Sequence, residues 1–154
     1  MTLSTSKIAS LCAALSVALL MLLASAMGVR TWNVPTGSME PAIPAGSAVL
    51  TVPGDLETGV PYVYRDEASA RFVAHRLVRV TDRGELVFKG DAISAPDRPL
   101  DSQDDVQGRI VAMLPGAGSL VPVAGNAAWA LCAGVIALSC LTPHLTRTTT
   151  EHRE

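Results

Sequence analysis

The sequence predicts a mainly β domain, a small sheet or partly closed barrel, flanked by two transmembrane helices. Three observations lead to this fold class. Uncharged apolar stretches lie near the two ends of the chain, and only 17% of all residues are charged. Between these stretches, short runs rich in β-branched residues alternate with turns that contain Gly and Pro. The length of 154 residues leaves room for one folded domain.

The first apolar stretch, residues 8–29, predicts a membrane anchor that forms segment 1–30 together with the N-terminal tail. It contains no charged residue, and a helix of this length would span about 33 Å, enough for the ~30 Å hydrocarbon core of a bilayer. The alternative is a cleavable secretory signal, because Lys7 precedes the stretch and Ala24-Ser25-Ala26 has the small-x-small pattern of a cleavage site. The stretch is longer than the apolar region of most signals, so we expect a retained anchor.

The second apolar stretch predicts a second transmembrane helix at 119–142, followed by a cytoplasmic tail at 143–154. It is less apolar than the first stretch, and a buried helix of the folded domain is the alternative. Basic residues flank the two helices on their outer sides, at Lys7, Arg147 and Arg153. This distribution favours a cytoplasmic location for both ends of the chain. We therefore expect a multi-pass protein of the cell membrane, with residues 31–118 on the extracytoplasmic side.

Short apolar runs predict the strands of the domain at 31–118. The runs are 47–52, 60–64, 70–80, 85–89 and 107–113. The third and fourth are joined by Thr81-Asp82-Arg83-Gly84, which is typical of a hairpin turn. No segment between them has a clear helical period, so the domain is expected to be a small β-sheet or partly closed barrel.

Charge and cysteine positions exclude several kinds of partner and site. Residues 31–118 contain eight Lys and Arg against twelve Asp and Glu, a net charge of −4. An acidic domain offers no footprint for a phosphate backbone, so nucleic acid is not expected as a partner. Cys12, Cys132 and Cys140 all lie in the apolar stretches, which excludes a disulfide, a thiolate zinc site and a thiol nucleophile in the domain. We expect neither a metal nor another cofactor.

Three clusters in the domain carry side chains that could act together. Ser38 lies on a turn bounded by prolines, His75 is the only histidine of the domain, and a loop supplies Asp91 and Asp97. Taken singly, these would be an ordinary turn, a half-buried strand residue and a solvated acidic loop. Taken together, they fit a nucleophile, its base and the group that orients the base, because a serine hydroxyl needs both to attack a carbonyl.

The same clusters resemble signal peptidase I, specifically its archaeal and endoplasmic-reticulum-type branch, also found in some Gram-positive bacteria. Gly-Ser-Met-Glu-Pro at 37–41 is similar to the nucleophile motif of the family. His75-Arg76 matches the place where this branch carries a histidine base and the main bacterial branch a lysine. Lys-Gly-Asp at 89–91 with Asp97-Arg98 resembles the acidic motif. The resemblance covers residues of about 32–98 and the anchor before them.

The resemblance implies a membrane-bound serine endopeptidase that removes N-terminal signal peptides from exported precursors after small-x-small sites. It implies that Ser38 is the nucleophile and His75 the general base. Asp97 would orient His75, Asp91 would be a supporting acid, and Thr36 would contribute to the oxyanion hole. The implied partners are the precursors, the lipid bilayer and the secretion machinery.

Several alternatives stay open at this stage. Lys89 would be the base in a Ser–Lys mechanism, although its place aligns with the acidic motif. Which of the two acids orients His75 is not decided by their spacing. Ile93 stands where many relatives have asparagine. A processing peptidase dedicated to a few precursors and a non-catalytic membrane-anchored β domain are the alternative functions.

Overall fold

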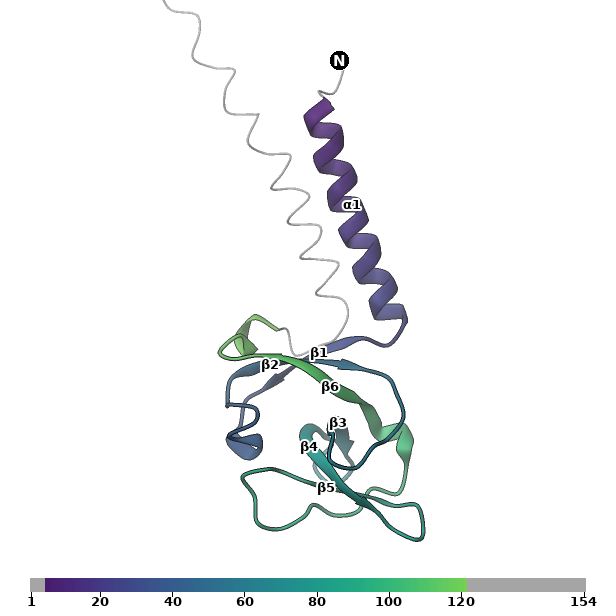
Figure 1. Ribbon diagram of the computed structural model, residues 1–154, viewed down its shortest axis with the longest axis vertical. Helices are drawn as coiled ribbons and strands as arrows, with labels where there is room; N and C mark the ends of the chain where they lie inside the picture. Colours follow the sequence, from purple (N-terminus) through teal and green to yellow (C-terminus); the bar gives the residue numbers. More distant parts are fainter. Residues whose placement is uncertain (1–4, 122–154) are drawn as a thin grey trace, which may run out of the picture. The chain divides into compact units, whose positions relative to one another are not determined.

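The computed structural model of the protein describes residues 5–121, which form one α-helix, six β-strands and three short 3-10 turns (Figure 1). The elements in chain order are α1 (Thr5–Ala26), β1 (Arg30–Val34), η1 (Gly37–Met39), β2 (Ser47–Val52), β3 (Pro61–Asp66), β4 (Arg71–Val80), β5 (Leu86–Lys89), η2 (Gln103–Asp105), β6 (Val106–Leu114) and η3 (Gly118–Leu120). The helix and the strands belong to two separate compact units, divided after Ala26.

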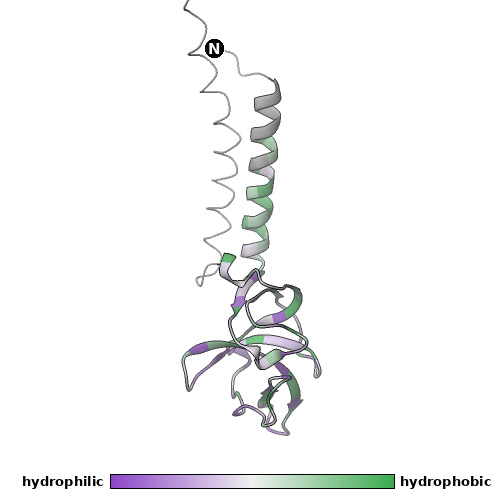
Figure 2. Cartoon of the chain, turned by 90° about the vertical axis from the view of Figure 1, so that its left-hand side faces the viewer, coloured by the Kyte–Doolittle hydropathy of each residue, from purple (hydrophilic) through white to green (hydrophobic). Residues whose placement is uncertain are grey.

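Helix α1 is 22 residues long and lies within the predicted anchor segment. Its described side chains are mostly hydrophobic (Figure 2). Several of its leucines are well exposed: Leu15, Leu19, Leu20, Leu22 and Leu23. Within residues 5–121, no helix combines the length and the apolar character needed to cross a membrane.

The predicted second helix at 119–142 falls almost entirely outside the described residues, as does the tail at 143–154. Of that helix only 119–121 are described, and Gly118–Leu120 form the 3-10 turn η3.

The strands form one antiparallel sheet in the order β1-β2-β6-β3-β4-β5, so the prediction of a mainly β domain is confirmed. The partly closed barrel is wrong: β1 and β5 are the two ends of an open sheet. β1 pairs only with β2, which leaves its other edge free of strand partners within the described residues. The sheet is strongly bent, and β1 and β4 come to face each other although they are not paired (Figure 1).

Five strands were predicted to within two residues, and β2 at its observed bounds. Strand β1 was missed. It starts only a few residues after α1, and its Arg30-Thr-Trp-Asn-Val sequence lacks the regular alternation of apolar and polar residues by which strands are recognised. Pairing with β2 is what makes this segment a strand.

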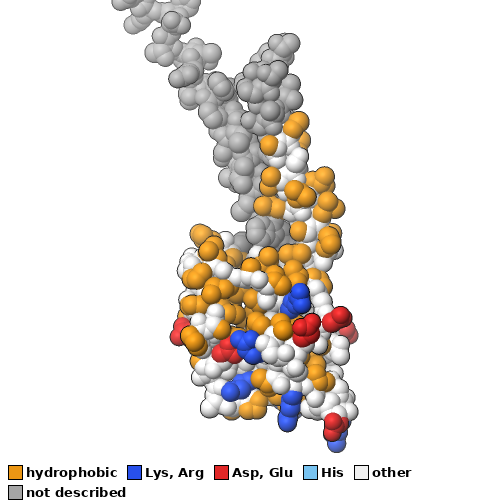
Figure 3. All heavy atoms as spheres, in the orientation of Figure 1, with side chains coloured by type: hydrophobic (Ala, Val, Ile, Leu, Met, Phe, Trp, Pro, Cys, Tyr) orange, Lys and Arg blue, Asp and Glu red, His pale blue; other side chains and the backbone are white. Residues whose placement is uncertain are grey.

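Two hydrophobic clusters fill the space that the bent sheet encloses. The first contains Tyr62, Tyr64, Leu77, Leu86, Phe88 and Leu100. The second contains Val34, Met39, Ile43, Val49 and Val63. On the face of the strand domain shown in Figure 3, acidic and basic side chains are intermixed. The clusters matter for function because residues beside them carry the candidate chemistry.

Candidate active site

The turn that carries Ser38 is held by the residue after it. Gly37–Met39 form the 3-10 turn η1 between β1 and β2, closed by the Glu40 N–H, which donates to the Gly37 carbonyl over 3.0 Å. The Met39 side chain has no solvent exposure and belongs to the second hydrophobic cluster. Burial of Met39 therefore fixes the turn, and Ser38 is left partly exposed.

His75 lies in the middle of β4, and its partner is Asp97. The Nδ1 atom of His75 lies 2.5 Å from Oδ2 of Asp97, so Nδ1–H donates to the carboxylate. The loop that carries Asp97 is fixed to the sheet because the backbone N–H of Asp97 donates to the Phe88 carbonyl in β5 over 2.8 Å. With Nδ1 used in this way, Nε2 is the nitrogen available to accept a proton.

Asp91 has a different partner, the arginine next to His75. Arg76 forms a two-pronged contact with Asp91, from Nε to Oδ1 over 2.9 Å and from Nη2 to Oδ2 over 2.6 Å. Arg76 Nη1 also donates to the Gly59 carbonyl over 2.6 Å. The hydrogen bonds from Arg76 lower the pKa of the Asp91 carboxyl below its ordinary value. Asp91 is thus a structural acid that ties its loop to β4.

The two acids that the sequence offered differ in the residue that each contacts. Asp97, and not Asp91, is hydrogen-bonded to His75. The structure brings His75 and Asp97 together and keeps Asp91 on the neighbouring arginine.

Gly90 brings the Ser38 turn and His75 to the same place. A Cβ atom added to Gly90 would lie 2.6 Å from the Ser38 carbonyl oxygen and 2.9 Å from His75 Nε2. The Ala92 N–H donates to that same Ser38 carbonyl over 2.9 Å. The serine turn and the imidazole therefore meet across a backbone position that has room for hydrogen only. No signal in the sequence pointed to this role for Gly90.

The Ser38 hydroxyl lies 3.4 Å from the Thr36 hydroxyl. Within the described residues, that is its only hydrogen bond, and none joins Ser38 Oγ to His75 Nε2. Catalytic hydrogen bonds are often long without substrate and tighten when it binds. Thr36 is exposed beside Ser38, which is where an oxyanion donor would lie if Ser38 were a nucleophile.

Tyr64 is a further member of the site that the sequence reasoning missed. Its hydroxyl donates to Asp97 Oδ2 over 2.9 Å, the same oxygen that accepts from His75. Its ring stacks on Phe88 with the centroids 4.3 Å apart. Burial, and next the negative charge of Asp97, raise the pKa of the Tyr64 hydroxyl, so the phenol stays a donor throughout the neutral range. Tyrosines are common in strands, so the sequence does not distinguish Tyr64. Only the fold brings it next to Asp97.

The position of Lys89 weakens the alternative of a Ser–Lys mechanism, and Ile93 lies near Gly90. Lys89 ends β5 and lies opposite Arg76 in the register, the residue whose side chain holds Asp91. Neighbouring residues of a strand point to opposite faces, so Lys89 does not share the face of His75. The Ile93 Cδ1 atom lies 3.1 Å from the position that a Gly90 Cβ would take, beside Nε2 of His75.

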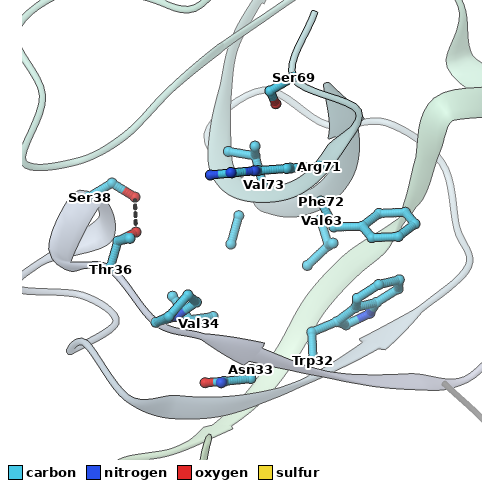
Figure 4. A pocket seen from close by; sticks show the side chains of 12 residues that line it. Trp32, Asn33, Val34, Thr36, Ser38, Val63, Ser69, Arg71, Phe72 and Val73 are labelled. Carbon is cyan, nitrogen blue, oxygen red and sulfur yellow. Dashed lines mark hydrogen bonds between the residues drawn. The ribbon is translucent and has the colours of Figure 1, made fainter. Parts of the chain in front are cut away.

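A cavity of about 310 Å³ opens beside Ser38, between β1 and β4 (Figure 4). Its lining is mainly apolar and includes Val34, Val63 and Ala74. Trp32 and Phe72 close the part away from Ser38, with their ring centroids 4.7 Å apart (Figure 4). The Ser38 turn thus adjoins an open, mainly apolar cavity beside the edge strand β1.

No group of His, Cys, Asp and Glu suited to a metal ion is found in the described part of the chain. Neither the protein-family models nor the curated proteins contain a match to this chain.

Proposed function

We propose that this protein is a signal peptidase I of the Ser–His–Asp kind, which removes N-terminal signal peptides from exported precursors after small-x-small sites. The observation that carries the proposal is the pairing of His75 Nδ1 with Asp97 while Nε2 and the Ser38 turn meet at Gly90. A hydroxyl nucleophile, a histidine with one nitrogen free and a carboxylate that orients it are the minimum set for acyl transfer.

The chemistry follows from the roles of these groups. Nε2 of His75 takes the proton from Ser38 Oγ as the oxygen attacks the scissile carbonyl, and later gives it to the leaving amine. Asp97 holds the imidazole by Nδ1 and stabilises its protonated form. The N–H of Ser38, in the first turn of η1, has no partner within that turn and is available to the oxyanion, together with the Thr36 hydroxyl.

The cavity is consistent with a substrate bound in extended form. Its mainly apolar walls would accept the small apolar residues of a small-x-small site. The free edge of β1 runs along it, and an extended peptide could add to that edge through main-chain hydrogen bonds. Signal peptides end in small residues at the cleavage site, which matches these features.

Membrane attachment and an extracytoplasmic site are part of the proposal. Their support is the uncharged run at 8–29 and the exposed leucines of α1, whose contact with lipid would be favourable. Extraction of membranes with alkaline carbonate tests the attachment: the full chain is expected in the pellet. Release into the supernatant would contradict it without bearing on the peptidase chemistry. N-terminal sequencing separates an anchor from a cleaved signal, since a mature chain that starts near Met27 would contradict the anchor.

The catalytic proposal is tested with the full chain in detergent and a precursor that has an Ala-x-Ala site. Cleavage after the second alanine is expected by mass spectrometry, and Ser38→Ala and His75→Ala should each lower kcat/KM by about 10⁴-fold or more. Lys89→Ala is the matched control and should keep most of the activity. Full activity in Ser38→Ala, or loss in Lys89→Ala with retention in His75→Ala, would overturn the proposed mechanism.

The range of substrates is tested in cells. Depletion of the protein should lead to uncut precursors of many exported proteins if it serves general secretion. Accumulation of only a few would identify a dedicated processing enzyme.

A further inference from the structure

Arg71 is the one charged side chain among the residues that line the cavity beside Ser38. It starts β4 and is exposed. Figure 4 shows its side chain extending from β4 toward the side of the cavity on which Ser38 and Thr36 lie. The other lining residues are apolar or neutral. A substrate that fills the cavity would therefore meet a single positive charge.

Asp66, the acid placed to pair with Arg71, is hydrogen-bonded to Ser69. Asp66 lies directly opposite Arg71 in the pairing of β3 with β4, the position from which opposite charges normally pair. Its Oδ2 atom instead accepts from the Ser69 hydroxyl over 2.6 Å and from the Ser69 N–H over 3.0 Å. Within residues 5–121 the Arg71 guanidinium has neither an ion pair nor a hydrogen bond.

Arg76 of the same strand shows what a structural arginine looks like in this fold. It is bonded to both oxygens of Asp91 and to the Gly59 carbonyl. Arg71 has none of these ties, and it adjoins the nucleophile cavity. A free guanidinium in such a place is suited to bind a carboxylate with two parallel hydrogen bonds.

A peptide in the cavity would remove water from Arg71, and the cost depends on what replaces the water. An acidic side chain restores the lost hydrogen bonds and adds attraction between opposite charges. A neutral side chain leaves the guanidinium to the solvent on its open side. A basic side chain adds repulsion, which is an effective means of rejecting a wrong partner.

We propose that Arg71 is a specificity-determining residue, which favours precursors with Asp or Glu at the substrate position facing the start of β4 and disfavours Lys or Arg there. The inference rests on the proposed peptidase function and goes beyond it, because small-x-small recognition carries no charge preference.

The test compares the full chain in detergent with its Arg71→Glu variant on a set of peptides. All peptides share one Ala-x-Ala site, and each carries a single Asp, Asn or Lys at one of the positions on either side. At one position we expect the native protein to cleave the Asp peptide about 5-fold faster than the Lys peptide in kcat/KM, the scale of a partly exposed ion pair. The Arg71→Glu variant should reverse that order. High salt should shrink both preferences.

Arg79→Glu is the matched control. Arg79 lies on the same strand, is exposed and does not line the cavity, and its substitution changes the net charge equally. It should keep the native order of substrates. The same reversal in Arg79→Glu would show that total charge decides, and would overturn the assignment to Arg71.

Failure of this inference can be told apart from failure of the proposed function. Cleavage that depends on Ser38 but shows the same charge order in the native protein and in Arg71→Glu overturns the inference alone. The peptides are also titrated onto the Ser38→Ala variant by fluorescence anisotropy. If the Ser38→Ala variant binds the Asp peptide more tightly than the Lys peptide, and adding Arg71→Glu to it reverses this order, the inference is supported. If the native protein then cleaves none of the peptides, the peptidase proposal alone is overturned. If the peptides are neither bound nor cleaved, both the inference and the proposed function are overturned.

Discussion

The loop after β5 carries two carboxylates, and each meets one of two adjacent residues of β4. Asp97 accepts from His75, and Asp91 accepts from Arg76. Adjacent strand residues point to opposite faces, so β4 directs the two acids of one loop to different sides. On one side a carboxylate meets an imidazole, whose other nitrogen can accept a proton, and on the other it meets a guanidinium, which cannot.

The difference teaches that motif spacing alone does not assign roles to neighbouring acids. Asp91 and Asp97 are equivalent by residue type and close in sequence. The residue that each contacts decides whether it can take part in proton transfer or only fix the loop. The two sides should therefore respond differently to equivalent substitutions.

The largest expected contrast is between Asp97→Asn and Asp91→Asn, which remove the same charge at nearly constant size. Asp97→Asn should lower kcat/KM by about 10³–10⁴-fold, because the imidazole loses its orienting acceptor. Asp91→Asn should cost less than about 10-fold, since only the loop loses support. Steady-state cleavage of the precursor measures both. Equal losses would show that the two acids are not divided as their contacts indicate.

A smaller loss is expected when the space between Ser38 and His75 is filled. The Cβ of Gly90→Ala would lie 2.6 Å from the Ser38 carbonyl oxygen, so the turn or the imidazole must move. A displacement of this kind should cost about 10²-fold in kcat. Gly54→Ala is the control, because its Cβ meets nothing closer than 3.8 Å. Native activity in Gly90→Ala would mean that the separation of the two groups is not critical.

Tyr64→Phe tests the support of Asp97 and should cost about 3- to 10-fold in kcat/KM. The ring and its stacking on Phe88 are kept, and only the donor to Asp97 Oδ2 is lost. Without that donor, the carboxylate that orients the imidazole is held less firmly. Steady-state cleavage of the precursor should show a lower kcat with little change in KM. An unchanged kcat in Tyr64→Phe would assign Tyr64 to packing alone.

The smallest effect concerns stability, on the Asp91 side. Arg76 lowers the pKa of the Asp91 carboxyl below its unfolded value of 3.8. The pair therefore stabilises the fold above that pH and loses its effect as pH falls through the lowered folded value. Asp91→Asn should reduce the free energy of unfolding by about 1 kcal/mol at neutral pH. Thermal unfolding should show the difference from the native protein shrink as the pH falls below 3.8. A difference that persists there would trace to packing.

The comparison also shows where the sequence sufficed and where it did not. Runs of β-branched residues between Gly and Pro turns were enough to place five strands, because strand patterns and turn residues are local signals. Strand β1 was missed since only its partner β2 makes it a strand.

For the site, the sequence supplied Ser38, His75 and the two acids by residue type and resemblance. The choice of Asp97 over Asp91, and the parts of Tyr64 and Gly90, depend on segments far apart in the chain that the sheet brings together. No local pattern encodes such contacts.

The burial of Met39 links the proposed nucleophile, Ser38, to the unfolding of one half of the core. Met39 is fully enclosed in the cluster with Val34 and Val49, and it directly follows Ser38 in the chain. Local opening of that cluster would free the turn while the Tyr62–Phe88 half of the core stays packed. On heating, the proposed activity would then be lost below the temperature at which the sheet as a whole unfolds. Loss of activity would report the local unfolding of this half of the core.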